Sequence, residues 1–402
     1  MPDTPLSPDG LSTLHDLMAA HVASGALPGL VTLVAAGDEV HVDVVGTPSF
    51  TDPTPLRRDA VFRIASLTKP IVAATAMSLV DDGVLHLDQP VDDLLPELAE
   101  RRVLRAIDAD LDDTVPARRS ITVDDLLTYR MGFGSVMAPP DTVPIQRAEA
   151  GAGLQSIGGP PWPPGRHDPD SWIAALGSLP LMYQPGERWL YNTSGQVLGV
   201  LVARAAGTDL ASVVRERILE PLGMSDTGFS VPTDAQARLT TFYVPDAETG
   251  APTVLDDPAD SWLGNPPRFP DGSGWLVSTV DDYWAFVSML LRGGSVDGAR
   301  ILTEASVAQM TTDHLTDAQR AGNAPFLGEH DGWGFGMAVP AAGSTGVPLP
   351  CGFGWEGGSG TTWRTNPERG VTGILLTQRQ MMSPEPPPVF SDFWAGVNAA
   401  AT

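Results

Sequence analysis

Strand-like patterns occupy both ends of this chain, and helical patterns fill the region between them. Near the start, residues 30–36 and 40–45 are rich in apolar side chains and flank a short Gly-Asp-Glu turn, which is typical of two neighbouring strands. Near the end, short apolar segments separated by glycines recur between residues 332 and 378. Because a strand buries its apolar face only against other elements, the two ends are expected to share one sheet.

Helical spacing of apolar residues marks the other elements. Residues 11–24 have apolar side chains at a helical period, and residues 71–80 form an apolar run that stops at an Asp-Asp-Gly sequence. A last helix is predicted over residues 390–400.

The order of these patterns predicts an α+β fold, with an antiparallel sheet built from the N- and C-terminal segments. Residues 1–62 and 270–402 are expected to form the sheet domain. Residues 63–269 are expected to form a mostly helical domain, with the active site between the two.

Acidic residues outnumber basic ones by 49 to 24, which gives a formal charge of −25. Such a surface repels phosphate backbones and anionic membranes, so we expect neither nucleic acid nor a membrane as a partner. The one cysteine, Cys351, allows no disulfide within the chain and is expected to be inert. The sequence shows no secretory signal pattern, so we expect a soluble, cytoplasmic protein. Its oligomeric state stays open.

Lysine occurs once in the chain, at position 69, and the other 23 of the 24 basic residues are arginines. Arginine keeps its proton at any accessible pH, whereas a desolvated lysine can lose it and act as a base. Lys69 follows Ser66 by three residues, so on a helix the amine can reach the hydroxyl. The S-x-x-K spacing alone is common by chance, but a lone lysine at that spacing indicates a nucleophile with its base.

Residues 62–70, which contain this pair, resemble the first motif of the serine β-lactamases, the penicillin-binding proteins and the related family VIII carboxylesterases. Other segments resemble that superfamily in the same order along the chain: residues 121–132, 185–193, 220–229, 274–282 and 354–358. The order is more specific than any one motif, because short motifs recur by chance.

This resemblance implies a serine β-lactamase/D,D-peptidase-like fold and a set of roles. Ser66 would be the acyl-accepting nucleophile, with Lys69 and Tyr191 as its proton-transfer partners. The backbone N–H groups of Ser66 and Gly358 would form the oxyanion hole. We expect Tyr191 to need a pKa lowered from about 10, which a neighbouring Lys69 ammonium could supply. No cofactor is implied.

Four positions near these motifs are predicted to contact the substrate: Thr193, Trp355, Glu356 and Gly357. β-Lactamases usually have asparagine at the first and lysine or histidine at the second, and both residues help to hold a β-lactam. Trp355 offers apolar surface instead. Glu356 replaces a glycine common in the esterases, and we expect it to repel anionic ligands. These departures favour neutral esters over β-lactams.

We therefore predict a serine hydrolase, best described as a carboxylesterase for short-chain neutral esters. Three alternatives stay open. The first is an amide-directed relative: a β-lactamase, a D,D-peptidase or a D-amino-acid amidase. The second is an acyltransferase with an acceptor other than water, and the third is a binding module without turnover. The sequence lacks the G-x-S-x-G elbow of α/β-hydrolases and the glycine motifs of nucleotide-binding proteins.

No metal site is expected, because the seven histidines show no paired spacing. Two candidate acidic groups have another explanation. Asp125 and Asp282 follow Thr122 and Thr279 by three residues, which is typical of a helix start. The carboxylates are therefore predicted to serve these helix starts rather than to bind a metal.

Overall fold

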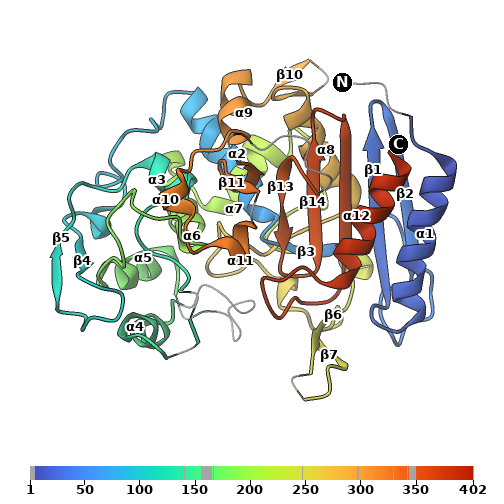
Figure 1. Ribbon diagram of the computed structural model, residues 1–402, viewed down its shortest axis with the longest axis horizontal. Helices are drawn as coiled ribbons and strands as arrows, with labels where there is room; N and C mark the ends of the chain where they lie inside the picture. Colours follow the sequence, from blue (N-terminus) through green and yellow to red (C-terminus); the bar gives the residue numbers. More distant parts are fainter. Residues whose placement is uncertain are drawn as a thin grey trace.

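A seven-stranded antiparallel sheet forms one side of the molecule (Figure 1). The computed structural model describes residues 5–136, 138–139, 141–154, 165, 167–246, 248–296, 298–328, 330–341, 343 and 350–401. In spatial order the strands are β11 (Asp331–Trp333), β12 (Ala338–Pro340), β13 (Phe353–Gly357), β14 (Thr361–Asn366), β15 (Val371–Thr377), β1 (Gly29–Ala36) and β2 (Glu39–Gly46). Strands from the two ends are neighbours, with Leu30 of β1 opposite Thr377 of β15. The predicted α+β fold is confirmed.

Both faces of this sheet are covered by helices. The helices concerned are α1 (Pro8–Ala23), α12 (Pro388–Ala400) and α8 (Val280–Leu291). In β1, Leu30 and Val34 belong to the apolar cluster with α1 and α12, which pack against each other. Val31 and Leu33 point to the opposite face and join the main core with α8. Because β1 is buried on both faces, each of its residues except Thr32 is apolar or glycine, and the sequence does not alternate.

The remaining helices lie mostly on the other side of the molecule (Figure 1). They are α2 (Thr68–Asp81), α3 (Val123–Leu127), α4 (Pro144–Ala152), α5 (Pro169–Gly177), α6 (Thr193–Ala206), α7 (Leu210–Val214), α9 (Glu304–Met310), α10 (Asp317–Arg320) and α11 (Ala324–Leu327). Further helical turns are η1 (Pro96–Leu98), η2 (Arg215–Leu219), η3 (Gln236–Arg238) and η4 (Trp262–Gly264). Helix α2 contacts α6, α7 and α9 and is almost wholly buried, which explains its apolar sequence. It is the central helix of this part of the fold.

Four two-stranded ladders complete the described structure. They are β3 (Phe62–Ala65) with β8 (Leu276–Ser278), β4 (Arg102–Leu104) with β5 (Thr114–Pro116), β6 (Phe242–Pro245) with β7 (Pro252–Asp256), and β9 (Ser295–Val296) with β10 (Ala299–Arg300). The β6–β7 hairpin projects from the body of the molecule (Figure 1). The division of the chain into a sheet domain and a helical domain stays a prediction.

Both predicted helix starts are present. Thr122 and Asp125 form a reciprocal capping box at α3. At α8, Thr279 accepts a hydrogen bond from the backbone N–H of Asp282, as expected. The Asp282 carboxylate, however, accepts from the Thr227 hydroxyl at 2.9 Å, so it joins two segments instead of closing a box.

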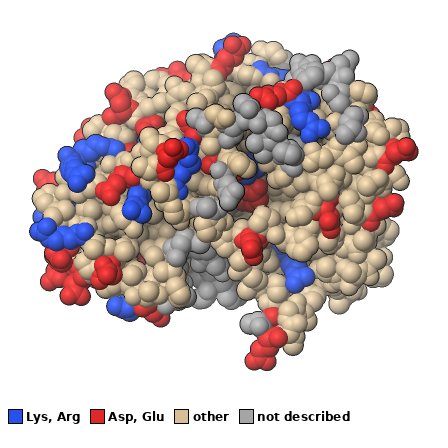
Figure 2. Space-filling view, in the orientation of Figure 1, with Lys and Arg blue, Asp and Glu red and all other residues tan. Residues whose placement is uncertain are grey.

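Acidic side chains are spread over the face shown in Figure 2 rather than gathered in one patch. No group of three or more His, Cys, Asp or Glu side chains in the described part of the chain could hold a metal ion. Within those residues no single helix is long and apolar enough to cross a membrane; one sharply bent pair, Thr193–Ala206 with Leu210–Leu219, passes by length and composition only.

Candidate active site

Ser66 lies at the sharp turn that joins strand β3 to helix α2. Ala65, just before it, has φ +43°, in a region that residues with a Cβ rarely adopt. The pairing of β3 with β8 holds this turn in place, with Phe62 opposite Ser278. The backbone N–H of Lys69 donates to the Ser66 carbonyl at 3.1 Å, so the two residues share the first turn of the helix.

Lys69 is almost completely buried, with 1% of its surface exposed. Its Nζ donates to Ser66 Oγ at 2.8 Å and to the Ser273 carbonyl at 2.5 Å. Burial lowers the pKa of Lys69 to about 7, because the charged amine loses its hydration, while the charge of Asp271 acts in the opposite direction. Near neutral pH a substantial fraction of this amine is therefore unprotonated.

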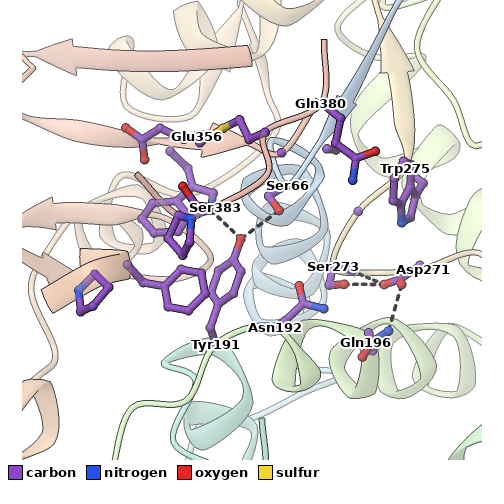
Figure 3. Close-up of a pocket in the computed structure, with 18 of the residues that line it drawn as sticks. Ser66, Tyr191, Asn192, Gln196, Asp271, Ser273, Trp275, Glu356, Gln380 and Ser383 are labelled. Atoms are coloured by element: carbon purple, nitrogen blue, oxygen red, sulfur yellow. Dashed lines mark hydrogen bonds between the residues drawn. The ribbon is translucent and has the colours of Figure 1, made fainter. Parts of the chain in front are cut away.

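The side chain of Tyr191 also points toward Ser66 (Figure 3). Its hydroxyl donates to Ser66 Oγ at 2.8 Å and accepts from the Trp355 indole N–H at 3.0 Å. Lys69 Nζ lies 4.6 Å from the centre of the phenol ring. The structure thus brings together the three residues predicted to carry the chemistry, although Tyr191 is 125 positions away from Ser66.

The predicted lowering of the Tyr191 pKa is wrong. Burial raises the pKa of Tyr191 to about 12, and the hydrogen bonds with Ser66 and Trp355 offset this only in part. The physical reason is that the same dry surroundings favour the neutral form of Lys69, so a full ammonium charge is not available to stabilise a phenolate. Tyr191 therefore keeps its proton over the ordinary pH range.

A cavity of about 690 Å³ opens in front of Ser66 and Tyr191. Much of its lining is aromatic, and Trp172 stacks on Phe269 with ring centres 5.2 Å apart. Other apolar lining residues are Phe242, Trp275, Phe326, Trp355, Met381 and Met382. A cavity of this size and character suits a small organic molecule that is largely apolar.

Gly358 also lines this cavity, just after the end of strand β13. A Cβ built at this position would meet no atom within 4 Å, so the space beside the backbone is open. Its carbonyl accepts from the Met381 N–H at 2.7 Å, which fixes the peptide chain here. A ligand can therefore approach the Gly358 backbone closely, and its role in an oxyanion hole stays a prediction.

Trp355 and Glu356 border the cavity, but each has a protein partner as well. Only 3% of Trp355 is exposed, and its indole N–H is directed to Tyr191. Glu356 Oε1 accepts from Arg364 at 3.2 Å, and Arg364 also donates to Asp331 at 2.9 Å. The predicted repulsion of anions by Glu356 is therefore partly offset by a buried arginine.

Two of the predicted substrate contacts are not cavity residues in the structure. A Cβ on Gly357 would lie 2.4 Å from the Ile64 carbonyl, so this glycine allows β13 to pack against β3. Thr193 is the first residue of α6, with 1% of its surface exposed. The residue before it, Asn192, lines the cavity instead, with φ +78° at the start of the helix. The Cβ position of Gly357 and the side chain of Thr193 therefore face protein atoms, and substrate contact by these two residues stays a prediction.

Among the cavity residues not predicted from the sequence are Asn192, Gln196, Asp271, Ser273 and Trp275. Asn192 and Trp275 lie within the family-like motifs at residues 185–193 and 274–282, and the other three lie close to these motifs. The signal was a Gly-Ser-Gly sequence at residues 272–274, which indicated a close approach without saying to what. Trp275 has φ +74°, an uncommon conformation for a bulky residue.

Comparison with known proteins places this fold and site in a family. The family model described as Beta-lactamase matches residues 14–388, nearly the whole chain. The chain belongs to the beta-lactamase family. The resemblance drawn from the motifs is thereby confirmed.

Individual members of the beta-lactamase family are similar to this chain over most of its length. Protein Rv1367c of Mycobacterium tuberculosis (strain ATCC 25618 / H37Rv) is 39% identical over 367 residues, which cover 88% of this chain and 86% of that protein. Esterase EstB of Burkholderia gladioli is 32% identical over 368 residues, covering 87% and 86%. The solved structure of EstCE1, a hydrolase with promiscuous acyltransferase activity, has a TM-score of 0.78 and 22% identity, and covers 97% of this chain and 99% of that one. Proteins similar to this beta-lactamase-family chain thus include an esterase, EstB, and a hydrolase with promiscuous acyltransferase activity, EstCE1.

Proposed function

We propose that this beta-lactamase-family protein is a carboxylesterase that cleaves short-chain neutral esters through an acyl-enzyme on Ser66. One observation carries the proposal. The amine of Lys69, with a lowered pKa, and the phenol of Tyr191, with a raised pKa, each lie 2.8 Å from the same serine oxygen. A base and an acid at one nucleophile are what a two-step acyl transfer needs.

In the first step, neutral Lys69 takes the proton of the Ser66 hydroxyl as the serine oxygen attacks the ester carbonyl. The lowered pKa of Lys69, about 7, supports this role, because a base acts best when its pKa lies near the working pH. The backbone N–H groups of Ser66 and Gly358 would then hold the oxyanion of the tetrahedral intermediate. The open space beside Gly358 supports that assignment.

When the intermediate collapses, the bond between the acyl carbon and the alcohol oxygen breaks, and Tyr191 gives its proton to the departing alkoxide. A pKa of about 12 supports this role, since the phenol is still protonated when the alcohol leaves. The phenolate that forms retains the N–H of Trp355 and regains its proton from the ammonium of Lys69. Water, activated by the same pair, then releases the acid from Ser66.

The lining of the cavity supports a neutral substrate. Aromatic and methionine side chains form an apolar part of the lining, and the position of the basic third-motif residue of β-lactamases holds Trp355. The carboxylates of Glu356 and Asp331 share one arginine, so a substrate carboxylate would find little compensation there. A volume of about 690 Å³ leaves room for an alcohol group larger than the short acyl chain.

A direct comparison of substrates tests this function. We expect turnover of nitrophenyl acetate and butyrate to exceed that of the β-lactam nitrocefin, a carboxylate-bearing amide. A fluorophosphonate probe should label the wild-type protein and not the Ser66→Ala variant. Faster turnover of nitrocefin or of D-amino-acid amides than of the esters would instead assign an amide substrate. Absence of both turnover and labelling would favour a binding module.

Acyl transfer is a second candidate, supported by the shared fold with EstCE1, whose structure is titled a hydrolase with promiscuous acyltransferase activity. The chemistry differs only in the second step, where an alcohol replaces water as the acceptor. Product analysis with added short alcohols separates the two. A new ester that dominates over free acid at modest alcohol concentration would show transfer, and free acid alone would show hydrolysis.

A further inference from the structure

A short buried loop holds the carbonyl that contacts Lys69. The loop, residues 271–275, immediately precedes strand β8, and its Ser273 carbonyl accepts from Lys69 Nζ at 2.5 Å. Both the backbone N–H and the hydroxyl of Ser273 donate to Asp271 Oδ1 at 2.7 Å. On the other side, Gln196 Nε2 donates to Asp271 Oδ2 at 3.0 Å (Figure 3). A continuous line of hydrogen bonds therefore runs from Gln196 through Asp271 and Ser273 to the amine.

Glycines allow the backbone of this loop to pack closely against helix α6. A Cβ on Gly272 would lie 2.4 Å from the Gly195 carbonyl and 2.9 Å from Gly199 Cα. A Cβ on Gly199 would in turn lie 3.1 Å from Gly272 Cα. No side chain fits between the loop and the helix, so the loop packs backbone to backbone against α6, with the Ser273 carbonyl beside Lys69.

Asp271 is an acceptor to three donors, which is the bonding pattern of an ionised carboxylate. Only 8% of it is exposed, and the Gln196 side chain beside it is 4% exposed. Within the described residues, Gln196 Oε1 has no hydrogen-bond partner. The amide could therefore turn over and accept from a donor at position 271 without losing any existing contact except the one to Asp271.

Three tyrosines of the main core are also titratable: Tyr129, Tyr191 and Tyr283. The rings of Tyr129 and Tyr191 lie 6.4 Å apart, and the Tyr283 hydroxyl on α8 donates to the Leu67 carbonyl at 3.2 Å. Burial raises the pKa of all three, so they stay neutral in the working range. Glu356 on β13 acts on Tyr191. Among the described residues, Asp271 is therefore the charge that acts on the amine, and it raises the pKa of Lys69 against the effect of burial.

We propose that Asp271 is a positioning residue for the base: its buried carboxylate fixes the Ser273 carbonyl against Lys69 and supplies the counter-charge for the ammonium formed when Ser66 gives up its proton. This inference rests on the proposed role of Lys69. Without the carboxylate, the effect of burial on the amine would be unopposed and the pKa of Lys69 would fall further. The amine would then bind the serine proton too weakly. The proton acceptor would be worse at the pH where the enzyme works.

The single lysine allows a direct measurement. In protein made with lysine labelled with ¹³C at Cε, the one lysine of the chain gives one NMR resonance, whose pH titration reports Lys69 without any substrate. The test variant is Asp271→Asn, which keeps an oxygen for Ser273 and presents an N–H₂ that Gln196 Oε1 can accept after turning over. We expect its titration midpoint to fall by about one pH unit, since a nearby opposite charge shifts a pKa by that order. The acidic limb of kcat/KM for the ester should move by the same amount.

Two control variants separate charge from structure. Ser273→Ala removes one hydrogen bond to Asp271 and keeps its charge, so the midpoint should stay at the wild-type value. Asp282→Asn removes a buried carboxylate elsewhere, at the start of α8, and should also leave the midpoint unchanged. Should the Asp271→Asn variant not fold, Asp271→Ser removes the same charge with a smaller hydroxyl-bearing side chain and must give a shift in the same direction.

A wild-type or higher midpoint in the folded Asp271 variant would overturn the proposal, as would an equal fall in Asp282→Asn. A loss of activity without a shift would reduce Asp271 to a structural residue. These outcomes are distinct from a failure of the proposed function. If no ester is hydrolysed, the resonance still reports whether Asp271 sets the protonation of Lys69.

Discussion

The amine of Lys69 and the phenol of Tyr191 lie at the same distance from the Ser66 hydroxyl oxygen and are both buried, and yet one acts as a base and the other as an acid. Lys69 and Tyr191 each reach Ser66 Oγ at 2.8 Å, and both are buried. Burial disfavours whichever form is charged. For the amine the charged form is the protonated one, so its pKa falls to about 7, and for the phenol it is the deprotonated one, so its pKa rises to about 12. One physical effect thus makes a base on one side and an acid on the other.

The amine side depends on the ability to lose a proton, which Lys69→Arg would remove while keeping the charge. We expect a loss of about 10³-fold or more in kcat/KM, because arginine stays protonated and cannot accept the serine proton. Stopped assays with nitrophenyl butyrate measure it, with circular dichroism as the control for folding. Near-normal turnover would show that the base lies elsewhere and that the comparison is wrong.

The phenol side depends on the ability to give a proton, which Tyr191→Phe would remove. For an ethyl ester we expect a loss of about 10²-fold or more in kcat, since ethoxide needs a proton to leave. For the nitrophenyl ester of the same acid the loss should be clearly smaller, because nitrophenolate leaves without one. Equal losses with both leaving groups would instead indicate that Tyr191 acts mainly in positioning Ser66.

The pH profile separates the two sides in the unmodified protein. Only neutral Lys69 can accept the serine proton, so kcat/KM should fall about tenfold per pH unit below a midpoint near 7 and level off above it. Tyr191 keeps its proton up to about pH 12, so no descending limb is expected between pH 8 and 10. A bell-shaped profile with a fall near 9 would show that the phenol titrates much lower than the structure indicates.

Trp355→Phe gives the smallest expected effect and acts on the phenol side alone. It removes the N–H that donates to the Tyr191 hydroxyl at 3.0 Å and keeps an aromatic ring. One hydrogen bond to a developing phenolate contributes about 1.5 kcal/mol, so we expect kcat to fall about tenfold. The acidic limb near pH 7 should stay in place. A shift of that limb would mean that Trp355 also influences Lys69.

The fold was largely predictable because the hydrophobic pattern of each strand and helix lies within a short stretch of sequence. Apolar runs at both ends, with helical spacing between them, indicated a sheet shared by the two termini, and β1 and β15 are indeed paired. The sequence was less informative where a side chain's direction depends on tertiary packing. Gly357 and Thr193 lie beside the site in sequence, but the strand-to-strand contact with Ile64 and the start of α6 turn them inward.

By itself the sequence determined that a lone lysine stands one helical turn after a serine, and therefore that an amine can reach a hydroxyl. Residues three apart on a helix are neighbours whatever the rest of the chain does. Only the tertiary structure decided the protonation of that amine, because it is set by burial and by Asp271, which is far from Lys69 along the chain. The contact of Tyr191 with Ser66, and that of Trp355 with Tyr191, also depend on the tertiary structure. Long-range packing leaves no periodic signal in a sequence, and so the pKa values that divide base from acid could be read only from the folded chain.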